Sequence, residues 1–208
     1  MSEQKDRMLR GELYLARDAE LEADSRRCVE LLARFNDSGA DGAARAIALA
    51  ELLGSVGDGA VIRPPLQMDY GYQTTIGPRT FINVGAVILD VGRVSIGADV
   101  QIGPNVQLLT PTHPLDPEVR RTGLEAAEPI TIEDNVWLGG GVIVCPGVTI
   151  GCDTVVGLPI TSWPSASTNR RTTLRMRASS SMTRTRRAGV SASGGAAGGG
   201  AGARRPRH

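Results

Sequence analysis

Hydrophobic residues recur at intervals of six through the middle of the chain. One series consists of Ile76, Ile82, Ile88, Val94, Val100 and Val106. After a break, pairs of apolar or small residues continue the interval at 130/132, 136/138, 142/144, 148/150 and 154/156. Positions two apart on a strand point to the same side, so each pair predicts one short strand with an inward face. A glycine directly follows the second position of a pair at residues 97, 103, 139, 151 and 157, and the pattern predicts a tight corner at each of these glycines.

Three such strands close one coil of about eighteen residues, and stacked coils bury continuous aliphatic columns. The alternative, a β-sandwich, would need turn signals about every 8–12 residues, whereas the spacing here is six. The pattern therefore predicts a mainly β protein, a solenoid of parallel strands over residues 57–157. Residues 110–129 interrupt the repeat and are expected to form an inserted loop.

The segment before the repeat predicts helices. Apolar side chains fall at roughly helical spacing among charged residues, namely Leu21, Val29, Leu32 and Phe35. The Asn-Asp-Ser-Gly run at 36–39 breaks that pattern, and an Ala-rich helix is expected over 43–53, stopped by Gly54. We predict that residues 1–56 form a helical cap over one end of the solenoid.

Composition divides the chain in two. The net charge is +1, but ten Arg and no acidic residue lie from Thr154 onward, which leaves 13 Lys or Arg against 22 Asp or Glu before it. Aromatic residues make up only 3% of the chain, against 26 Gly, and this suits a core of Val and Ile. Residues 158–208, rich in Arg, Ser, Gly and Ala, predict a disordered basic tail that is able to contact nucleic acid or anionic lipid.

The remaining composition points to the cytoplasm. Cys28, Cys145 and Cys152 show no metal-ligand spacing and are expected to be buried thiols in a reducing compartment. The N-terminal residues include no apolar run of the kind a signal peptide needs. No apolar stretch approaches the roughly 20 residues that span a bilayer, so no membrane partner is predicted.

His113 is the best candidate for a catalytic group. It is one of two histidines and lies in the loop that interrupts the repeat, and long loops in compact folds are often functional. Imidazole suits a general base near neutral pH. The alternative is an exposed, inert loop histidine. A zinc site of the three-histidine type needs more histidines than this chain offers, so no metal is predicted.

Seven segments together resemble one family. These are MLRGELY at 8–14, DYGY at 69–72, FIN at 81–83, ILDV at 88–91, IGPNV at 102–106, THPLD at 112–116 and NVWLGGG at 135–141. They resemble the bacterial sugar O-acetyltransferases of the maltose and galactoside acetyltransferase family, with its nodulation-protein relatives. The resemblance implies a left-handed parallel β-helix, acetyl-CoA as acetyl donor and a sugar hydroxyl as acceptor. It also implies a homotrimer with sites between neighbouring subunits.

The resemblance also implies roles for individual residues. His113 would be the general base, and Glu125 would hold the second imidazole nitrogen, although an idle surface carboxylate is the alternative. The acceptor pocket would be formed by Asp69, Tyr72, Asn83 and Asp90. The coenzyme A site would include Trp137, Gly139, Gly140 and Gly141. Asn, Asp and Gly are also common at solenoid corners for turn geometry alone, and Trp137 is equally suited to packing between subunits.

This chain departs from the family pattern in three places. Gly85 replaces a second Asn, and the acceptor-binding Asp that follows the GELY motif in relatives has no clean counterpart here. After Gly157 the repeat stops, although relatives continue it and close on Val-Ala-Val-Gly-Asn-Pro-Ala-Arg. Back-translation of 159–166 one base earlier, with GC-rich codons, gives Asp-His-Val-Val-Ala-Val-Gly. We therefore hypothesise a deletion with a frameshift near Gly157.

Three functions are compatible with these features. The leading interpretation is an acetyl-CoA-dependent sugar O-acetyltransferase. The second is a catalytically impaired homologue, because the segments lost after Gly157 help to bind coenzyme A in relatives. The third is a nucleic-acid-binding protein that uses the basic tail; the frameshift hypothesis argues against it, because the arginines would then be a product of the wrong reading frame.

Overall fold

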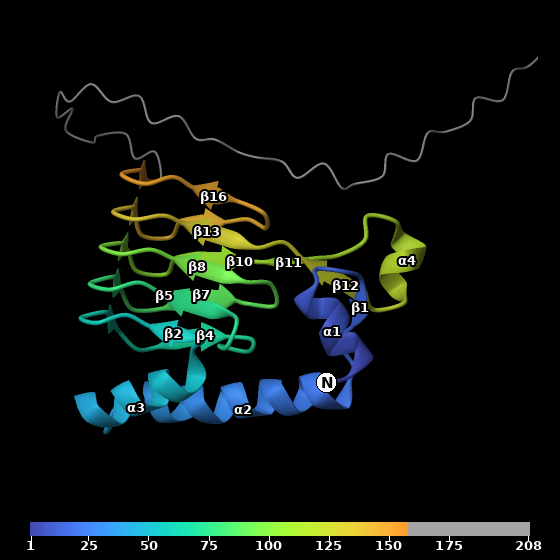
Figure 1. The fold of residues 1–208 in the computed structure, drawn as a ribbon, viewed down its shortest axis with the longest axis horizontal. Coiled ribbons are helices and arrows are strands. Elements are labelled where there is room, and N and C mark those ends of the chain that lie inside the picture. Colours follow the sequence, from blue (N-terminus) through green and yellow to red (C-terminus); the bar gives the residue numbers. More distant parts are fainter. Residues whose placement is uncertain (158–208) are drawn as a thin grey trace, which may run out of the picture.

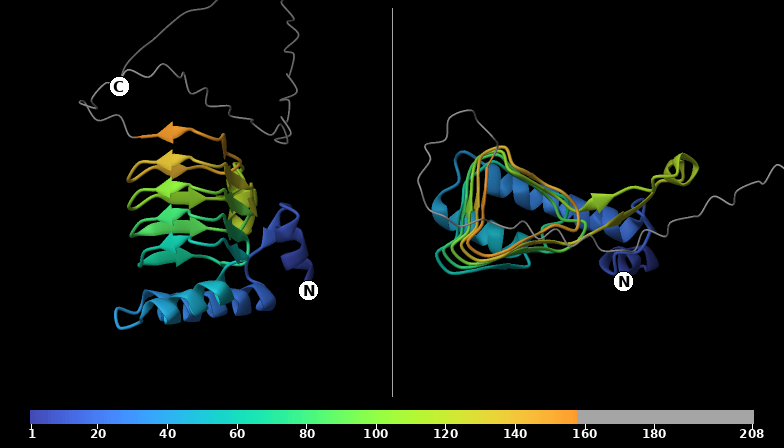
Figure 2. Two further views of the ribbon diagram at one scale, coloured as in Figure 1. Left: turned by 60° about the vertical axis from the view of Figure 1, so that its left-hand side comes forward. Right: turned by 90° about the horizontal axis from the view of Figure 1, so that it is seen from above.

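Three parallel sheets form the sides of a triangular solenoid (Figures 1 and 2) in the computed structural model, which describes residues 1–157. Sheet I contains β2 (Ser55–Val56), β5 (Thr74–Ile76), β8 (Val94–Ile96), β13 (Ile130–Ile132) and β16 (Thr149–Ile150). Sheet II contains β3 (Val61–Ile62), β6 (Phe81–Ile82), β9 (Gln101–Ile102), β14 (Trp137–Leu138) and β17 (Val155–Val156). Sheet III contains β4 (Leu66–Met68), β7 (Ala86–Leu89), β10 (Gln107–Leu109) and β15 (Ile143–Val144). The fold predicted from the six-residue period, a mainly β parallel solenoid with N-terminal helices, is confirmed.

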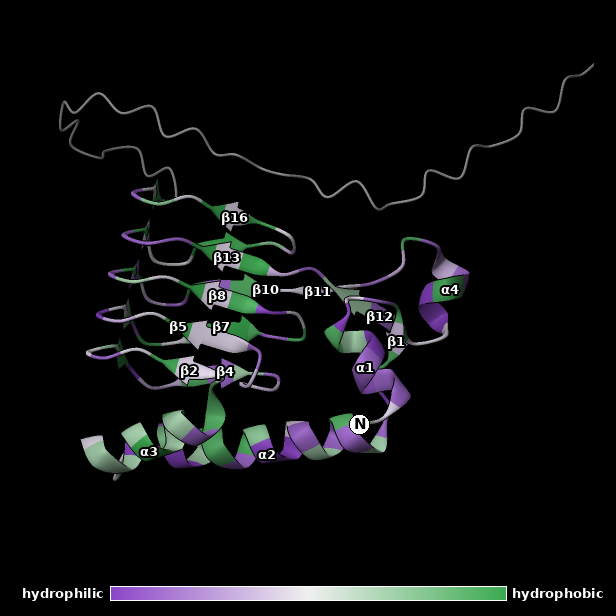
Figure 3. Ribbon diagram, in the orientation of Figure 1, coloured by the Kyte–Doolittle hydropathy of each residue, from purple (hydrophilic) through white to green (hydrophobic). Residues whose placement is uncertain are grey.

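The interior of the solenoid consists of aliphatic columns. In sheet I, Ile76, Ile96, Ile132 and Ile150 are paired from coil to coil, and all four are buried. Burying each such side chain contributes about 1.5–3 kcal/mol relative to exposure. The strands are coloured largely as hydrophobic in Figure 3. The core cluster continues from these columns into the helices at the end of the stack.

The glycines that end the strands have a different role from the one expected. Neither Gly97 nor Gly103 has a positive φ. Glycine is needed at these positions because the next coil leaves no room for a side chain. A Cβ on Gly97 would lie 2.8 Å from the backbone nitrogen of Asp134. The left-handed conformation falls two residues later, at Asp99 and Asn105, which have φ values of 58° and 57°.

Helices α2 (Ala19–Asn36) and α3 (Gly42–Leu52) lie across the first coil and cover its open end (Figure 1). The Asn36 amide fixes this cap to the solenoid, because it donates to the Leu66 carbonyl and accepts from the Leu66 backbone nitrogen, both at 2.9 Å. Val29, which fitted the helical spacing, is 62% exposed, and Cys28 lies on the buried face instead.

An arm at residues 110–129 projects from one corner of the triangle (Figure 2). It contains β11 (Pro111–Thr112), α4 (Pro117–Arg121) and β12 (Leu124–Ala127). Strand β12 lies between β11 and β1 (Tyr14–Leu15) in a separate three-stranded antiparallel sheet. Helix α1 (Glu3–Leu9) precedes β1, so the N-terminal segment supports the arm.

The expectations for the cysteines, for membrane spans and for the basic tail have different outcomes. The prediction of three buried thiols is wrong for two of them: Cys28 is buried, whereas Cys145 and Cys152 are exposed, and all three are free. Within residues 1–157, no helix has the length and apolar character needed to cross a membrane. The basic tail at 158–208 and the interpretations that depend on it lie outside the described residues.

Candidate functional site

The predicted site residues fall at two corners of the triangle. The arm corner, between sheets III and I, consists of residues 69–73, 90–93, 110–129 and 145–148. It holds Asp69, Tyr72, Asp90, His113 and Glu125. The glycine corner, between sheets II and III, consists of residues 63–65, 83–85, 103–106 and 139–142. It holds Asn83, Gly139, Gly140 and Gly141, and Trp137 lies just before it on β14.

His113 directly follows β11 and is exposed. The ladder between β11 and β12 pairs Pro111 with Ala127 and Thr112 with Ala126. Extending this register by one residue places His113 opposite Glu125, and opposed residues of a ladder project from the same face. Within residues 1–157 the imidazole of His113 makes no hydrogen bond or ion pair. It is therefore open to a ligand.

Glu125 contacts a different partner from the one expected. Its Oε1 accepts a hydrogen bond from the hydroxyl of Tyr14, which faces it across the β1–β12 ladder. Glu125 on β12 thus lies between Tyr14 on β1 and His113 at the end of β11. No hydrogen bond joins Glu125 to His113 among the described residues.

Asp69 belongs to an acidic group beneath the arm. Burial, followed by the nearby charges of Asp90 and Glu125, raises the pKa of Asp69 to about 6. Like charges in a partly desolvated site disfavour ionisation. Asp69 therefore offers a carboxyl group that exchanges a proton close to neutral pH.

Asp90 has no exposed surface. Its Oδ1 accepts from the backbone nitrogen of Tyr70 at 2.9 Å, and its Oδ2 accepts from the Thr74 hydroxyl at 3.1 Å. Burial raises the pKa of Asp90, and these hydrogen bonds oppose that shift. In this structure its oxygens face the corner of the preceding coil and are not accessible to a ligand.

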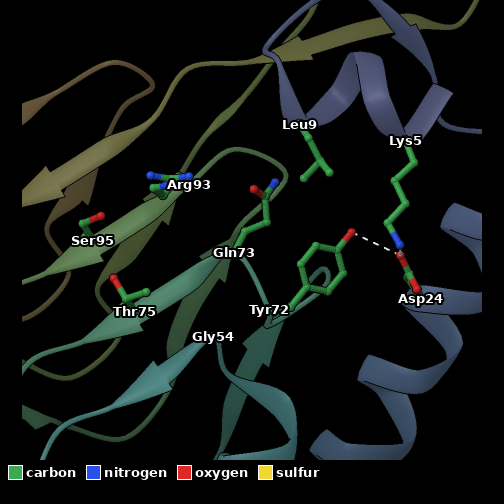
Figure 4. A pocket seen from close by; sticks show the side chains of 9 residues that line it. All are labelled: Lys5, Leu9, Asp24, Gly54, Tyr72, Gln73, Thr75, Arg93 and Ser95. Carbon is green, nitrogen blue, oxygen red and sulfur yellow. Dashed lines mark hydrogen bonds and ion pairs between the residues drawn. The ribbon is translucent and has the colours of Figure 1, made fainter. Parts of the chain in front are cut away.

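Tyr72 lines a cavity of about 600 Å³ between α1 and the outer face of sheet I (Figure 4). Its hydroxyl donates to Oδ2 of Asp24 at 3.2 Å, and Lys5 Nζ lies 5.4 Å from the ring centroid. Lys5 also pairs with Asp24 at 2.7 Å. Burial, followed by the Asp24 charge, raises the pKa of Tyr72, so the phenol stays neutral. The remaining lining combines polar side chains, among them Arg93, with the apolar Leu9.

The glycine corner presents backbone rather than side chains. Gly141 has a φ of 73°, which by itself accounts for glycine there. The side chain of Asn83 accepts from the Val84 backbone nitrogen at 2.9 Å and from Arg63 Nη1 at 3.4 Å. Trp137 projects outward from sheet II and is 41% exposed. These residues offer an open surface with backbone groups and one aromatic ring.

Sequence reasoning assigned no role to Tyr14, although it ends the GELY segment. The only signal was an aromatic residue in a short segment outside both the helices and the repeat. Its partner is 111 positions away, so no local spacing shows the contact. Within the described residues no group of three or more His, Cys, Asp or Glu is arranged to hold a metal ion.

Comparison with known proteins shows which family the chain is similar to. Residues 7–57 match the family model described as the maltose acetyltransferase hexapeptide capping motif. Nodulation protein L of Rhizobium meliloti is 48% identical over 147 residues, which cover 70% of this chain and 80% of that protein.

Two solved structures share the fold. A maltose O-acetyltransferase from Clostridium difficile superposes with a TM-score of 0.73 and 39% identity, covering 74% of this chain and 83% of that one. A hexapeptide-repeat acetyltransferase from Vibrio cholerae, in complex with acetyl coenzyme A, has a TM-score of 0.69 and 39% identity, covering 74% and 84% of the two chains.

Proposed function

Because this chain belongs to the hexapeptide-repeat acetyltransferase family of maltose O-acetyltransferase and nodulation protein L, we propose that it moves an acetyl group from acetyl-CoA to a sugar hydroxyl. The acceptor would be a maltose- or glucose-like sugar. The observation that carries this proposal is the position of His113, an exposed imidazole on the arm, in register with Glu125. A base at this place meets the needs of acyl transfer to an alcohol.

The proposed reaction uses His113 as general base. The imidazole takes the proton of the acceptor hydroxyl while its oxygen attacks the thioester carbonyl carbon. The tetrahedral oxyanion is stabilised by backbone amides or bound water. When the carbon–sulfur bond breaks, the imidazolium returns the proton to the sulfur of coenzyme A. The products are the acetylated sugar and free thiol, so protons and bonds balance.

The proposed acceptor pocket uses the accessible polar groups of the two corners. Asp69 and Tyr72 lie at the arm corner, and Asn83 lies at the glycine corner. Carboxylate, phenol and amide groups provide both acceptors and donors for sugar hydroxyls. We assign Asp90 a supporting role, because its oxygens are buried and bonded to Tyr70 and Thr74.

Coenzyme A is proposed to lie along the glycine corner. Gly139, Gly140 and Gly141 leave the backbone open to a pantetheine arm, and Trp137 provides an aromatic face beside them. A Cβ on Gly140 would be 3.3 Å from Pro104, so the space here is narrow for any larger residue.

We propose a homotrimer that completes the site. Sheet III separates the arm corner from the glycine corner, so one chain cannot bring His113 next to Gly140. Around a threefold axis parallel to the solenoid, with sheet III facing inward, the arm corner of one copy meets the glycine corner of the next. The outward side chains of sheet III include the apolar residues Val87 and Ile143, and Ile143 is 55% exposed. Those of sheet I are polar instead, and include Thr75, Ser95 and Thr131.

A thiol-release assay tests the proposed activity. Acetyl-CoA is supplied with maltose, glucose, galactosides or chitooligosaccharides, and free thiol is followed. Loss of a general base typically costs about 10²–10⁴-fold, so His113→Ala is expected to lose at least that lower factor in kcat. Leu115→Ala, at an exposed position on the same arm, is the control and should keep the wild-type rate. Equal rates for wild type and His113→Ala would reject the proposal.

A catalytically impaired homologue is the second candidate. It is favoured by the end of the six-residue repeat at Gly157, because the family resemblance implies that the segments beyond this point help to bind coenzyme A. Titration calorimetry of the full chain with coenzyme A separates the two. Binding supports the enzyme, whereas no heat at millimolar ligand supports the impaired form.

A further inference from the structure

Tyr14 is the largest fully buried side chain outside the solenoid interior. It has no exposed surface and lies in a second core cluster with Met8, Leu21, Tyr70, Val91 and Ala127. These residues come from α1, α2, the arm corner in two successive coils, and β12 of the arm. The ring is therefore held from several directions and has little freedom to move.

The hydroxyl of Tyr14 has one partner, the carboxylate of Glu125. A buried phenol that lacks a partner loses about 1–3 kcal/mol, so this bond resists breaking. Burial and then the Glu125 hydrogen bond raise the pKa of Tyr14, which keeps the phenol a neutral donor at working pH. A fixed donor thus holds the Glu125 side chain in one place.

Glu125 in turn faces the position of His113. The same residue of β12 is paired with Tyr14 on one side and stands level with His113 on the other. A carboxylate that accepts from one imidazole nitrogen fixes the tautomer and leaves the other nitrogen as the base. Its effect depends on where it is held, because a mobile carboxylate would turn toward water.

We propose that Tyr14 is a positioning residue, whose hydroxyl holds Glu125 in register with His113 and so sets the orientation and tautomer of the general base. This inference rests on the proposed function of His113. The segment before the solenoid thereby takes part in the acetyl-transfer site, in addition to covering the end of the coils.

Tyr14→Phe removes the hydroxyl and keeps the ring. We expect kcat to fall about 5- to 20-fold, which corresponds to about 1–1.8 kcal/mol of lost transition-state stabilisation, with KM for acetyl-CoA unchanged. Tyr70→Phe is the matched control, because Tyr70 lies in the same cluster and its hydroxyl does not bond to Glu125. That variant should stay within twofold of wild type.

Coupling to Glu125 distinguishes positioning from general loss of stability. The double variant Tyr14→Phe/Glu125→Ala should be no slower than Glu125→Ala, because both changes remove one interaction. Multiplied losses, or a Tyr14→Phe rate equal to wild type, would overturn the inference. With either of these results, a loss of activity in His113→Ala would still support the proposed function, so the two proposals can fail independently.

A second readout does not depend on turnover. The chain has two histidines, so ¹⁵N ring signals are few, and His113→Asn identifies those of His113. The ring nitrogen shifts report which nitrogen carries the proton. We expect Glu125→Ala and Tyr14→Phe to change the tautomer ratio in the same direction, and Tyr70→Phe to leave it unchanged. An unchanged ratio in Tyr14→Phe would reject the positioning role even if the chain proved inactive.

Discussion

The buried carboxylate of Asp90 accepts a 2.9 Å hydrogen bond from the backbone nitrogen of Tyr70. This contact joins the arm corners of two consecutive coils directly below the arm. A carboxylate without exposed surface is costly unless its oxygens are bonded, and here Thr74 supplies a further donor. These bonds therefore compensate for the burial of Asp90 and join one coil to the next at the arm corner.

Asp90→Ala is expected to destabilise the protein by about 2–4 kcal/mol, because two buried donors lose their acceptor. Asp90→Asn should cost less, since the amide oxygen still accepts one bond. The midpoint and slope of urea unfolding measure both effects. Glu30→Ala, an exposed carboxylate on α2, should leave the midpoint unchanged. A midpoint for Asp90→Ala equal to wild type would contradict the structural role.

Asp69 makes stability depend on pH. Its pKa is about 6 in the folded chain, against an ordinary value of 3.8. The folded state thus binds this proton more tightly than the unfolded state. The resulting stabilisation is fully present below about pH 3.8 and is lost as the pH rises through about 6.

Asp69→Asn cannot ionise, so it should be more stable than wild type above pH 7. The expected gain is about 1–3 kcal/mol, reduced by the solvent that still reaches this side chain. The difference should shrink toward pH 4. Urea unfolding at intervals from pH 4 to pH 8 measures it. Parallel curves for the two proteins would show that Asp69 ionises normally.

Close stacking of the coils makes some glycines irreplaceable. A Cβ on Gly77 would lie 2.4 Å from the carbonyl carbon of Gly97, which is backbone and cannot rotate away. We expect Gly77→Ala to cost more than about 2 kcal/mol. Gly42→Ala is the control, because nothing lies within 4 Å of the added carbon at the start of α3. Thermal unfolding compares them, and equal melting temperatures would refute the prediction.

The outer face of sheet III is expected to control assembly. Ile143→Glu places a charge on the face proposed to turn toward the threefold axis. We expect it to dissociate the trimer and to lower activity in parallel, because the site would be shared. Thr149→Glu, on the outer face of sheet I in the next strand, is the control.

Light scattering coupled to gel filtration measures the mass of each variant. A wild-type monomer, or an Ile143→Glu variant that keeps the wild-type mass, would count against the proposed arrangement. Loss of assembly in Thr149→Glu alone would move the interface to sheet I.

The sequence by itself determined the solenoid and where it is interrupted. Each coil repeats the same local rule, so the spacing that places Ile76 above Ile96 is visible in the chain without knowledge of distant contacts. The same register located the insertion that carries His113. Two of the expectations that failed, buried Cys145 and Cys152 and turn-forming glycines directly after the strands, concern details that a period does not encode.

Only the tertiary structure decided how the insertion is supported. The bond between Tyr14 and Glu125 joins residues 111 positions apart, in segments that belong to no repeat. The hydrogen bonds of the buried Asp90 likewise depend on the coil before it, which supplies Tyr70 and Thr74. Hydrophobic periodicity fixes which side a residue faces, because it is a local property of the strand. A hydrogen bond between the N-terminal segment and the inserted arm depends on how the chain closes in space, and no spacing along the sequence specifies that.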